Sequence, residues 1–232
     1  MRVAWATDLH LDAADRSDVE VWCDHVSRSG VTALLLGGDI SEARDLAQWL
    51  RFLNSRLGIP IFFVLGNHDY YGSDIATVRD AMRRLKGDQL CYLPEAGRVQ
   101  LHPDVALVGH GGWGDCCIGA VDDFQVLTDY LAIRDLGETI DREDLLGEFF
   151  KRAALRTALR ALGDDAAKTL RPDLLVAART SATVLVVTHV PPFRESCWHR
   201  GTISEETWLP GFTCKAMGDL LISVADSHPD SI

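Results

Sequence analysis

In the first ninety residues, continuous apolar runs alternate with segments of helical periodicity, and this alternation is the strongest constraint on the fold. The runs are apolar at every position rather than at every second one, as expected for strands covered on both faces. Strands separated by helices pair in parallel, so the sequence predicts an α/β fold with a largely parallel sheet. The apolar runs are 3–7, 31–36 and 60–65, and the helical segments are 17–30, 46–58 and 73–87, with Ser17 and Ser73 as caps and Gly30, Gly58 and Gly87 as ends.

Beyond residue 90 the pattern changes to shorter strands. Runs at 90–93, 98–101 and 105–109 are joined by short connections, which predicts antiparallel pairing. We find no repeat and no linker that divides the chain, so we expect a single domain over residues 1–232. The remaining predicted elements are a glycine-rich loop at 109–114, a helix at 141–163, a buried strand at 183–188 and a last helix at 217–224.

The composition excludes several classes of protein. Hydrophobic residues make up 47% and charged residues 25% of the chain, which is typical of a globular domain and excludes wholesale disorder. No apolar stretch approaches the roughly 18 residues of a membrane span, and the N-terminus meets Asp8 too early for a signal peptide, so we expect a cytoplasmic protein. The formal net charge of -11 disfavours nucleic acid as a partner. None of the six cysteines forms a Cys-x-x-Cys pair, and we expect free thiols.

Polar side chains stand at the ends of four predicted strands. In α/β folds, ligands bind where the carboxyl ends of the strands meet. Carboxylates, imidazoles and an amide oxygen that converge there are suitable ligands for divalent metals, and a bound cation would offset the cost of leaving them unpaired. The four segments are Asp8-Leu9-His10, Gly37-Gly38-Asp39, Gly66-Asn67-His68-Asp69 and Thr188-His189.

The order and spacing of these motifs resemble the calcineurin-like metallophosphoesterase superfamily over nearly the whole chain. The resemblance implies a metallophosphatase-type four-layer α/β/β/α sandwich with two mixed sheets. It also implies two divalent transition-metal ions, the first held by Asp8 and His10, the second by Asn67 and His189, with Asp39 bridging both. We expect manganese, and iron, zinc, nickel and cobalt also suit such ligands.

The same resemblance implies the chemistry. A metal-bridging hydroxide would attack the phosphorus of a small phosphoester in line with the leaving oxygen. His68 would face the phosphate and the leaving oxygen rather than bind a metal, and Asp69 would orient His68. The predicted function is dinuclear metal-dependent hydrolysis of phosphoesters, as in phosphatases and phosphodiesterases, and the sequence leaves open the choice between monoesters and diesters.

One motif of the superfamily is absent from the sequence, a Gly-His-x-His that supplies one histidine to each metal. We therefore expect a domain that lacks its C-terminal portion, with one imidazole fewer at each metal. The second sheet would then lack its closing strands, and its exposed edge would favour a homo-oligomer.

Several alternatives stay open at the level of sequence. One is a metal-poor, non-catalytic scaffold or interaction module with the same fold, which the missing motif favours and the intact four motifs oppose. Another is a nuclease, which the negative charge disfavours. His110 and Trp113 are candidates either for a wall of the substrate cleft or for structural packing. The aromatic segment after His189 is a further candidate either for packing or for shaping the substrate site, and it contains Phe193, Trp198, His199 and Trp208.

Overall fold

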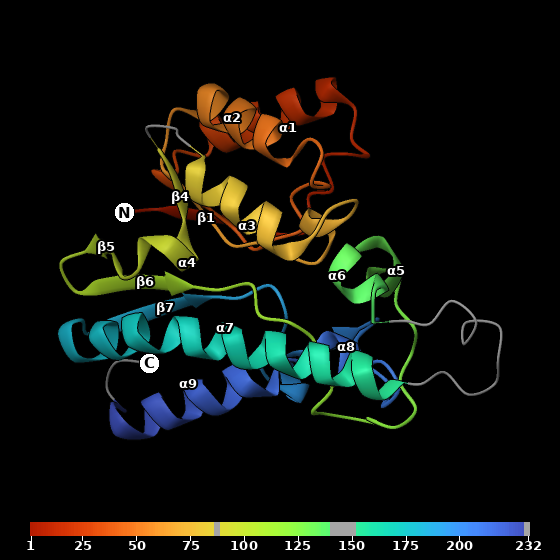
Figure 1. Ribbon diagram of the computed structural model, residues 1–232. Helices are drawn as coiled ribbons and strands as arrows, with labels where there is room; N and C mark the ends of the chain where they lie inside the picture. Colours follow the sequence, from red (N-terminus) through yellow and green to blue (C-terminus); the bar gives the residue numbers. More distant parts are fainter. Residues whose placement is uncertain (86–88, 140–151, 230–232) are drawn as a thin grey trace.

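The computed structural model describes residues 1–85, 89–139 and 152–229. Its first sheet has four strands, which are all parallel (Figure 1). Three helices lie in the sequence between consecutive strands of this sheet. The β-α-β-α-β-α order predicted for the first ninety residues is therefore confirmed. In sheet order the strands are β1 (Val3–Ala6), β2 (Ala33–Leu36), β3 (Ile61–Phe63) and β4 (Leu90–Tyr92), and the helices are α1 (Arg16–Arg28), α2 (Leu46–Leu57) and α3 (Ile75–Arg84).

The second sheet is mixed and has three strands in the order β5-β6-β7. β5 (Val99–His102) runs antiparallel to β6 (Val105–Gly109), and β6 runs parallel to β7 (Thr183–Val187). A parallel pair needs a crossover connection, and the long helix α7 (Arg152–Thr180) lies between β6 and β7 in the sequence. The last helix, α9 (Lys215–Ser227), was also predicted from its periodicity.

Three local predictions were wrong or incomplete. β4 joins the first sheet in parallel, because α4 (Leu93–Ala96) separates it from the antiparallel strands that follow. Ser17 lies inside α1, and Asp74 rather than Ser73 caps α3, where its side chain accepts a hydrogen bond from the backbone N–H of Thr77 at 2.8 Å. Gly87 and the first part of the predicted helix, 141–151, lie outside the described residues.

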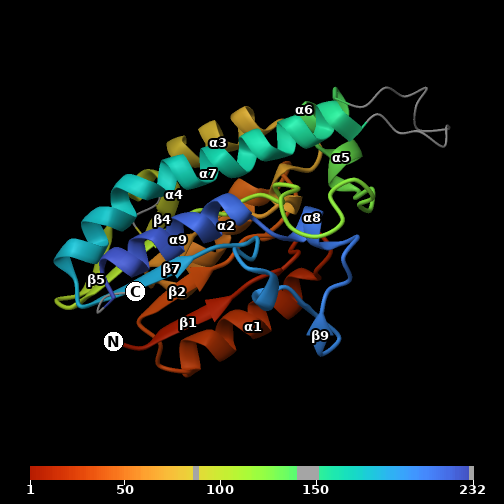
Figure 2. The same ribbon diagram turned by 90° about the horizontal axis from the view of Figure 1, so that it is seen from below.

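Successive side chains of a strand point to opposite faces of its sheet, so the apolar core has three layers. One lies between the two sheets, and one lies between each sheet and the helices that cover it. Leu34 and Leu36 of β2 pack against α1, α2 and α3, whereas Leu35 belongs to the cluster between the two sheets. On β6, Leu107 faces the first sheet and Val108 packs against α7 and α9. The result is the four-layer α/β/β/α sandwich that the resemblance implied (Figures 1 and 2), but with one parallel and one mixed sheet in the described residues rather than two mixed sheets.

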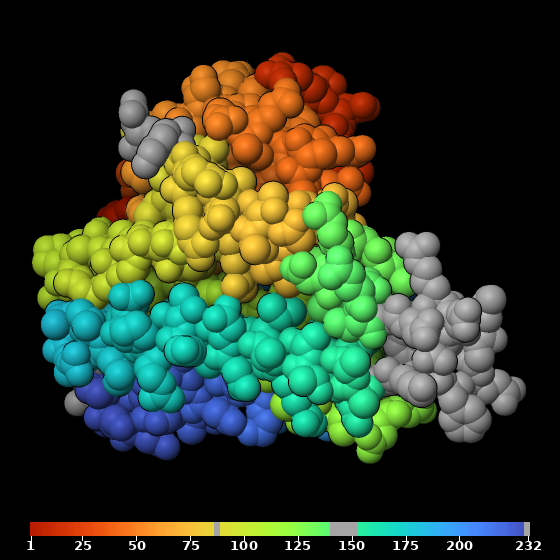
Figure 3. All heavy atoms as spheres, viewed as in Figure 1, coloured from red at the N-terminus to blue at the C-terminus, as the bar shows by residue number. Residues whose placement is uncertain are grey.

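The two outer layers meet at α3 and α7. Figure 3 shows the side chains of α7 as a band between those of α3 and α9. Arg79 of α3 forms an ion pair with Asp165 of α7, with a distance of 2.8 Å from Nη1 to Oδ2. The remaining described elements are short: η1 (His68–Tyr70), α5 (Asp129–Ala132), α6 (Arg134–Gly137), η3 (Arg194–Ser196), β8 (Trp198–His199), β9 (Thr202–Ile203) and α8 (Leu209–Phe212).

Two further predictions can be compared with the described residues. All six cysteines are free thiols, as predicted. Among the helices of 1–85, 89–139 and 152–229, none is both long enough and apolar enough to cross a membrane.

β7 is an edge strand of the second sheet in the described part of the chain. The run at 183–188 was predicted to be a buried strand, but β7 is only partly buried because it lies at this edge, and its Leu185 is 40% exposed. An unpaired, apolar edge is a template for pairing with another chain. The predicted homo-oligomer and the predicted loss of a C-terminal portion both stay predictions, and β7 is the edge on which we expect pairing.

We predict that Leu185→Lys shifts the protein from a dimer toward a monomer, because a charged side chain on an edge strand opposes pairing. Light scattering coupled to size-exclusion chromatography measures this mass directly. The matched control is Ile222→Lys on α9, which changes an even more exposed apolar side chain (51%) away from the sheet. An unchanged mass for Leu185→Lys would show that β7 is not the interface.

Candidate metal centre

The residues predicted to bind metals gather at the carboxyl ends of β1, β2, β3 and β7. Together with His68, which was predicted to act on the substrate, these five residues line one cavity of about 450 Å³; five of the six follow strands of the first sheet, and one follows a strand of the second. Strands far apart in the sequence thus deliver carboxylates, imidazoles and an amide to one place. The six are Asp8, His10, Asp39, Asn67, His68 and His189.

Asp39 lies at the middle of this arrangement. Its Oδ1 is 3.5 Å from Nε2 of His189, and its Oδ2 is 3.9 Å from Nε2 of His10. Two groups of potential ligand atoms, each within 4.8 Å of one another, share this carboxylate: Asp39 with His10 and His68, and Asp39 with Asp8 and His189. The geometry therefore accommodates two cations with Asp39 between them. His68 belongs to the first group by distance, so its assignment as a non-ligand stays a prediction.

The environment of Asp39 favours a bound cation. The residue is only 4% exposed, and in the part of the chain that the structure describes its side chain accepts a single hydrogen bond, from the backbone N–H of His68 at 2.9 Å. Burial raises the pKa of this carboxyl, while the neighbouring His189 opposes the rise. A cation at the shared position would stabilise the ionised carboxylate. Oxygen and imidazole nitrogen donors together fit a borderline divalent transition metal.

Three of the predicted ligands have strained backbone. The φ angles of Asp8, His10 and Asp39 are 54°, 43° and 50°, in the left-handed region that residues other than glycine rarely occupy. Backbone hydrogen bonds maintain this conformation, from the N–H of Asp8 to Gly38 O at 3.1 Å and from the N–H of His10 to Asp39 O at 3.0 Å. Such strain clusters at functional sites, where surrounding structure holds side chains in place.

Gly38 and Gly66 allow the loops after β2 and β3 to approach each other. A Cβ atom on Gly66 would lie 2.2 Å from Oδ1 of Asp39, and one on Gly38 would lie 2.6 Å from the backbone nitrogen of Gly66. His189 also lies against both positions, at 2.7 and 2.8 Å from these Cβ sites. Only glycine fits this contact between backbones.

Asp69 acts on the backbone. It is fully buried, and both of its oxygens accept hydrogen bonds from N–H groups of the two loops: Ile40 at 2.9 Å, Ser41 at 3.0 Å and Gly66 at 2.8 Å. Burial raises the pKa of Asp69 to about 7 against the opposing effect of these donors. The carboxylate therefore ties the β2 and β3 loops together. Asp69 was predicted to orient the His68 side chain, but among the described residues no hydrogen bond joins these two side chains.

Asp129 of α5 is a functional residue that sequence analysis missed. Its Oδ1 accepts a hydrogen bond from Nδ2 of Asn67 at 2.9 Å. A carboxylate only accepts, so this bond directs the amide oxygen of Asn67 the other way, where it lies 3.0 Å from Nε2 of His189. Asp129 thereby presents an oxygen of Asn67, rather than its NH₂ group, to the candidate metal position.

Tyr71 extends this network to His68. Its hydroxyl donates a short hydrogen bond to Asp129, and burial and that carboxylate raise the pKa of the phenol, which keeps it a donor. The Tyr71 ring stacks on the His68 imidazole with centroids 4.2 Å apart, and the His10 ring meets His68 edge to face at 4.6 Å. The His68 ring is therefore held between two aromatic neighbours.

We predict that Asp129→Leu weakens Mn²⁺ binding about 10- to 100-fold, because the Asn67 amide loses the partner that orients it. Equilibrium dialysis against Mn²⁺ measures the affinity, and circular dichroism reports whether the variant is folded. Asp129→Asn keeps an acceptor oxygen and should recover part of the affinity. Asp122→Leu, at an aspartate whose side chain is 86% exposed, is the control. Equal Mn²⁺ affinity in the wild type and a folded Asp129→Leu would contradict the role of Asp129.

His110 and Trp113 differ in position. Trp113 lines the cavity and also packs against Tyr70, with ring centroids 5.6 Å apart. His110 is 5% exposed and is not part of the cavity wall, and its Nδ1 accepts a hydrogen bond from the N–H of Gly112 at 3.0 Å. The structure thus supports the packing role for His110. Burial and, to a smaller extent, the positive charge of Arg79 lower the pKa of His110 from 6.5 to about 4, while the negative charge of Asp165 opposes this shift.

This pKa predicts an acid-sensitive contribution to stability. The unfolded chain takes up a proton at His110 below about pH 6.5, whereas the native protein does so only near pH 4, so the free energy of unfolding falls across that interval by about 3 kcal/mol. Urea unfolding at about pH 7.5 and about pH 4.5 measures this loss. His110→Asn retains the acceptor for Gly112 and should flatten the dependence on pH. An identical pH dependence in the two proteins would show that His110 titrates normally.

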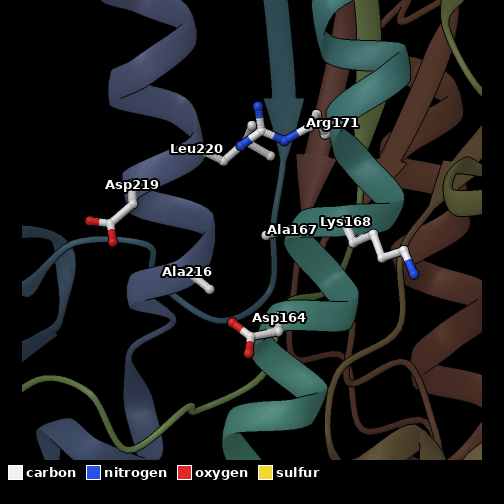
Figure 4. A pocket seen from close by; sticks show the side chains of 7 residues that line it. All are labelled: Asp164, Ala167, Lys168, Arg171, Ala216, Asp219 and Leu220. Carbon is white, nitrogen blue, oxygen red and sulfur yellow. The ribbon is translucent and has the colours of Figure 1, made fainter.

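A second hollow lies between α7 and α9 and contains none of the predicted site residues (Figure 4). Figure 4 shows Asp164 on α7 and Asp219 on α9, with Lys168 directed away from α9. Asp219 is paired with Lys215 at 2.5 Å. Among the described residues, the groups of potential metal ligands that converge lie in the strand-end cavity and not in this hollow, so the strand-end cavity is the candidate site.

The comparisons with known proteins agree with this geometry. A sequence model of the family described as calcineurin-like phosphoesterase matches residues 1–228. Among curated protein sequences, none matches the chain.

Two solved structures share the fold. Phosphopantetheinyl hydrolase from Mycobacterium tuberculosis superposes with a TM-score of 0.57 and 15% identity, over 93% of this chain and 76% of that one. A dimetal phosphatase from Danio rerio superposes with a TM-score of 0.54 and 14% identity, over 99% of this chain and 78% of that one. At this level of identity the likeness concerns the fold.

Proposed function

The chain belongs to the calcineurin-like phosphoesterase family and is a metal-dependent hydrolase, and we propose that it cleaves small phosphomonoesters or phosphodiesters at a centre for two divalent metal ions. The observation that carries this proposal is the position of the Asp39 carboxylate. It belongs to both groups of potential ligands and is buried between them. A carboxylate has one oxygen for each of two cations.

The residues of the cavity would divide between the two ions. Asp8 and His10 would hold the first ion, Asn67 and His189 the second, and Asp39 both. When bound, two such ions supply a nucleophilic water of lowered pKa and neutralise phosphoryl oxygens. We propose manganese, although the same donors suit iron, zinc, nickel and cobalt.

His68 would act on the substrate. It lines the cavity, and the stacked Tyr71 limits the movement of its ring. A ring N–H of His68 would donate a hydrogen bond to the phosphoryl group as negative charge develops there. The same proton would then pass to the leaving alcohol oxygen. Because the strained backbone and the tied loops hold the site in advance, little rearrangement would accompany the reaction.

The alternatives are less well supported. A scaffold without metals would have no need for a buried carboxylate between three imidazoles. A nuclease would need a cationic surface, and the net charge is -11. The free cysteines suit a reducing compartment, and we propose a cytoplasmic location.

The first test is metal content and turnover. We expect about two manganese ions per chain after loading and desalting, measured by elemental analysis, and metal-dependent release of nitrophenol from p-nitrophenyl phosphate or its bis ester. Metal-loaded protein that hydrolyses neither ester would contradict the proposal.

Two substitutions test the division of roles. Asp39→Asn removes the shared charge, and we predict loss of bound metal together with nearly all turnover. His68→Ala removes the proton donor, and we predict a fall in kcat of about 100-fold or more with metal content nearly intact. Elemental analysis and initial rates on the same samples separate the two effects. Equal loss of metal in both variants would place His68 among the ligands.

A further inference from the structure

A second cavity opens beside the metal centre. It has a volume of about 600 Å³ and lies between the β8–β9 hairpin and α8. Pro191, Trp198 and Phe212 line both this cavity and the metal cavity, so the two cavities are adjacent. We call it the aromatic cavity. Its volume suits one small ligand.

The walls of the aromatic cavity contain large apolar side chains that face water. Trp198 is 63% exposed, Phe212 41%, Trp208 40% and Ile203 39%. These are four of the twelve exposed large hydrophobic side chains among the described residues, and all four line this one cavity. A concentration of exposed aromatic surface marks a binding site, because covering it is favourable.

The walls are also pre-formed. Arg200 and Gly201 form the turn of the hairpin with φ angles of 51° and 84°, as in the type I′ turns that suit two-residue hairpins. Trp198 pairs directly with Ile203 across the hairpin, so both side chains lie on the same face. The indole N–H of Trp198 donates to Glu195 O at 2.6 Å.

The opposite wall is formed by Trp208 and Phe212. Their rings have centroids 5.8 Å apart and planes inclined at 32°, so the two rings are tilted toward each other and form one aromatic wall. The rim nearby is polar, with His199, Arg200 and Glu205. Flat aromatic faces combined with hydrogen-bonding groups at the edge suit a planar ring that has polar atoms on its periphery.

From this geometry we propose that the aromatic cavity binds the alcohol portion of the substrate, and that this portion carries a planar heteroaromatic ring, as in a mononucleotide. The inference rests on the proposed function, which puts the phosphoryl group in the adjoining metal cavity. The ring would stack against Trp208 and Trp198. Of the four aromatic residues noted in the sequence after His189, Trp198, His199 and Trp208 line the cavity, whereas Phe193 packs against Gly218 of α9.

The test compares adenosine 5′-monophosphate with ribose 5-phosphate, which share the phosphate ester on the ribose 5′-oxygen and differ in the presence of the base. With manganese-loaded wild type we expect kcat/KM to be about tenfold or more higher for the nucleotide. Trp208→Ala should remove this preference, by lowering kcat/KM for the nucleotide much more than kcat/KM for ribose 5-phosphate. Trp208→Phe should restore most of it. Trp5→Ala, at a tryptophan that is 68% exposed and lines neither cavity, should preserve it.

Binding of adenosine to the metal-free protein gives a readout that does not depend on turnover. Calorimetry should detect binding to the wild type and to Trp5→Ala, and about tenfold weaker binding to Trp208→Ala. If no phosphoester is hydrolysed, the proposed function fails, and this binding experiment still decides the inference. Undetectable adenosine binding to the wild type would then overturn it.

Other outcomes overturn the inference and leave the hydrolase intact. One is an equal kcat/KM for adenosine 5′-monophosphate and ribose 5-phosphate, in the wild type as well as in Trp208→Ala. Another is a preference for octyl phosphate that is lost in Trp208→Ala, which would assign the cavity to an alkyl chain. A third is a dimer that Trp208→Ala converts to a monomer, which would make the exposed rings a subunit interface.

Discussion

The buried carboxylate of Asp39 is the constraint on which the rest of the site depends. It stands among imidazoles in a place that water scarcely reaches, with one backbone N–H as its hydrogen-bond donor. Burying a charge so sparsely paired is costly unless a cation joins it. The left-handed backbone at Asp8, His10 and Asp39 raises that cost further. The apolar core under the sheet and the three N–H groups on Asp69 hold this arrangement together.

The site also depends on how the two sheets are placed against each other. His189 comes from the second sheet, and its Nδ1 is 2.9 Å from Gly37 O of the first. The backbone N–H groups of His189 and Val190 both donate to Gly111 O. The apolar contact between the sheets, with Leu35 and Leu107, sets the distance across which His189 reaches Gly37 O. Packing far from the chemistry therefore fixes where the last ligand stands, and a shift of one sheet would separate His189 from Asp39.

The sequence predicts the parts of the site that local pattern determines. Asp8, Asp39 and Asn67 each follow an apolar run, and parallel strands bring such positions together whatever the intervening sequence. Asp129 has no comparable signal, because it lies on a four-residue helix and meets Asn67 only through tertiary contact. The pairing of β4 was mispredicted for a similar reason: strand length and spacing do not reveal which sheet a strand joins. The cap of α3 was also mispredicted, because Ser73 and Asp74 are both suitable cap residues in the sequence. The backbone of the folded chain selects Asp74.

The two cavities differ in how they are stabilised, and this difference bears on function. Around the metal centre, backbone hydrogen bonds and close glycine contacts fix each loop, so few substitutions are compatible with it. The aromatic cavity is bounded by a two-residue hairpin turn and a four-residue helix, and both carry exposed side chains. Substitution of these side chains would disturb neither of the two large sheets. On the proposed function, the rigid centre would perform one reaction, and the wall beside it would select the alcohol. Since the two cavities share Trp198 and Phe212, the position of the bound alcohol would determine how the phosphoryl group meets His68.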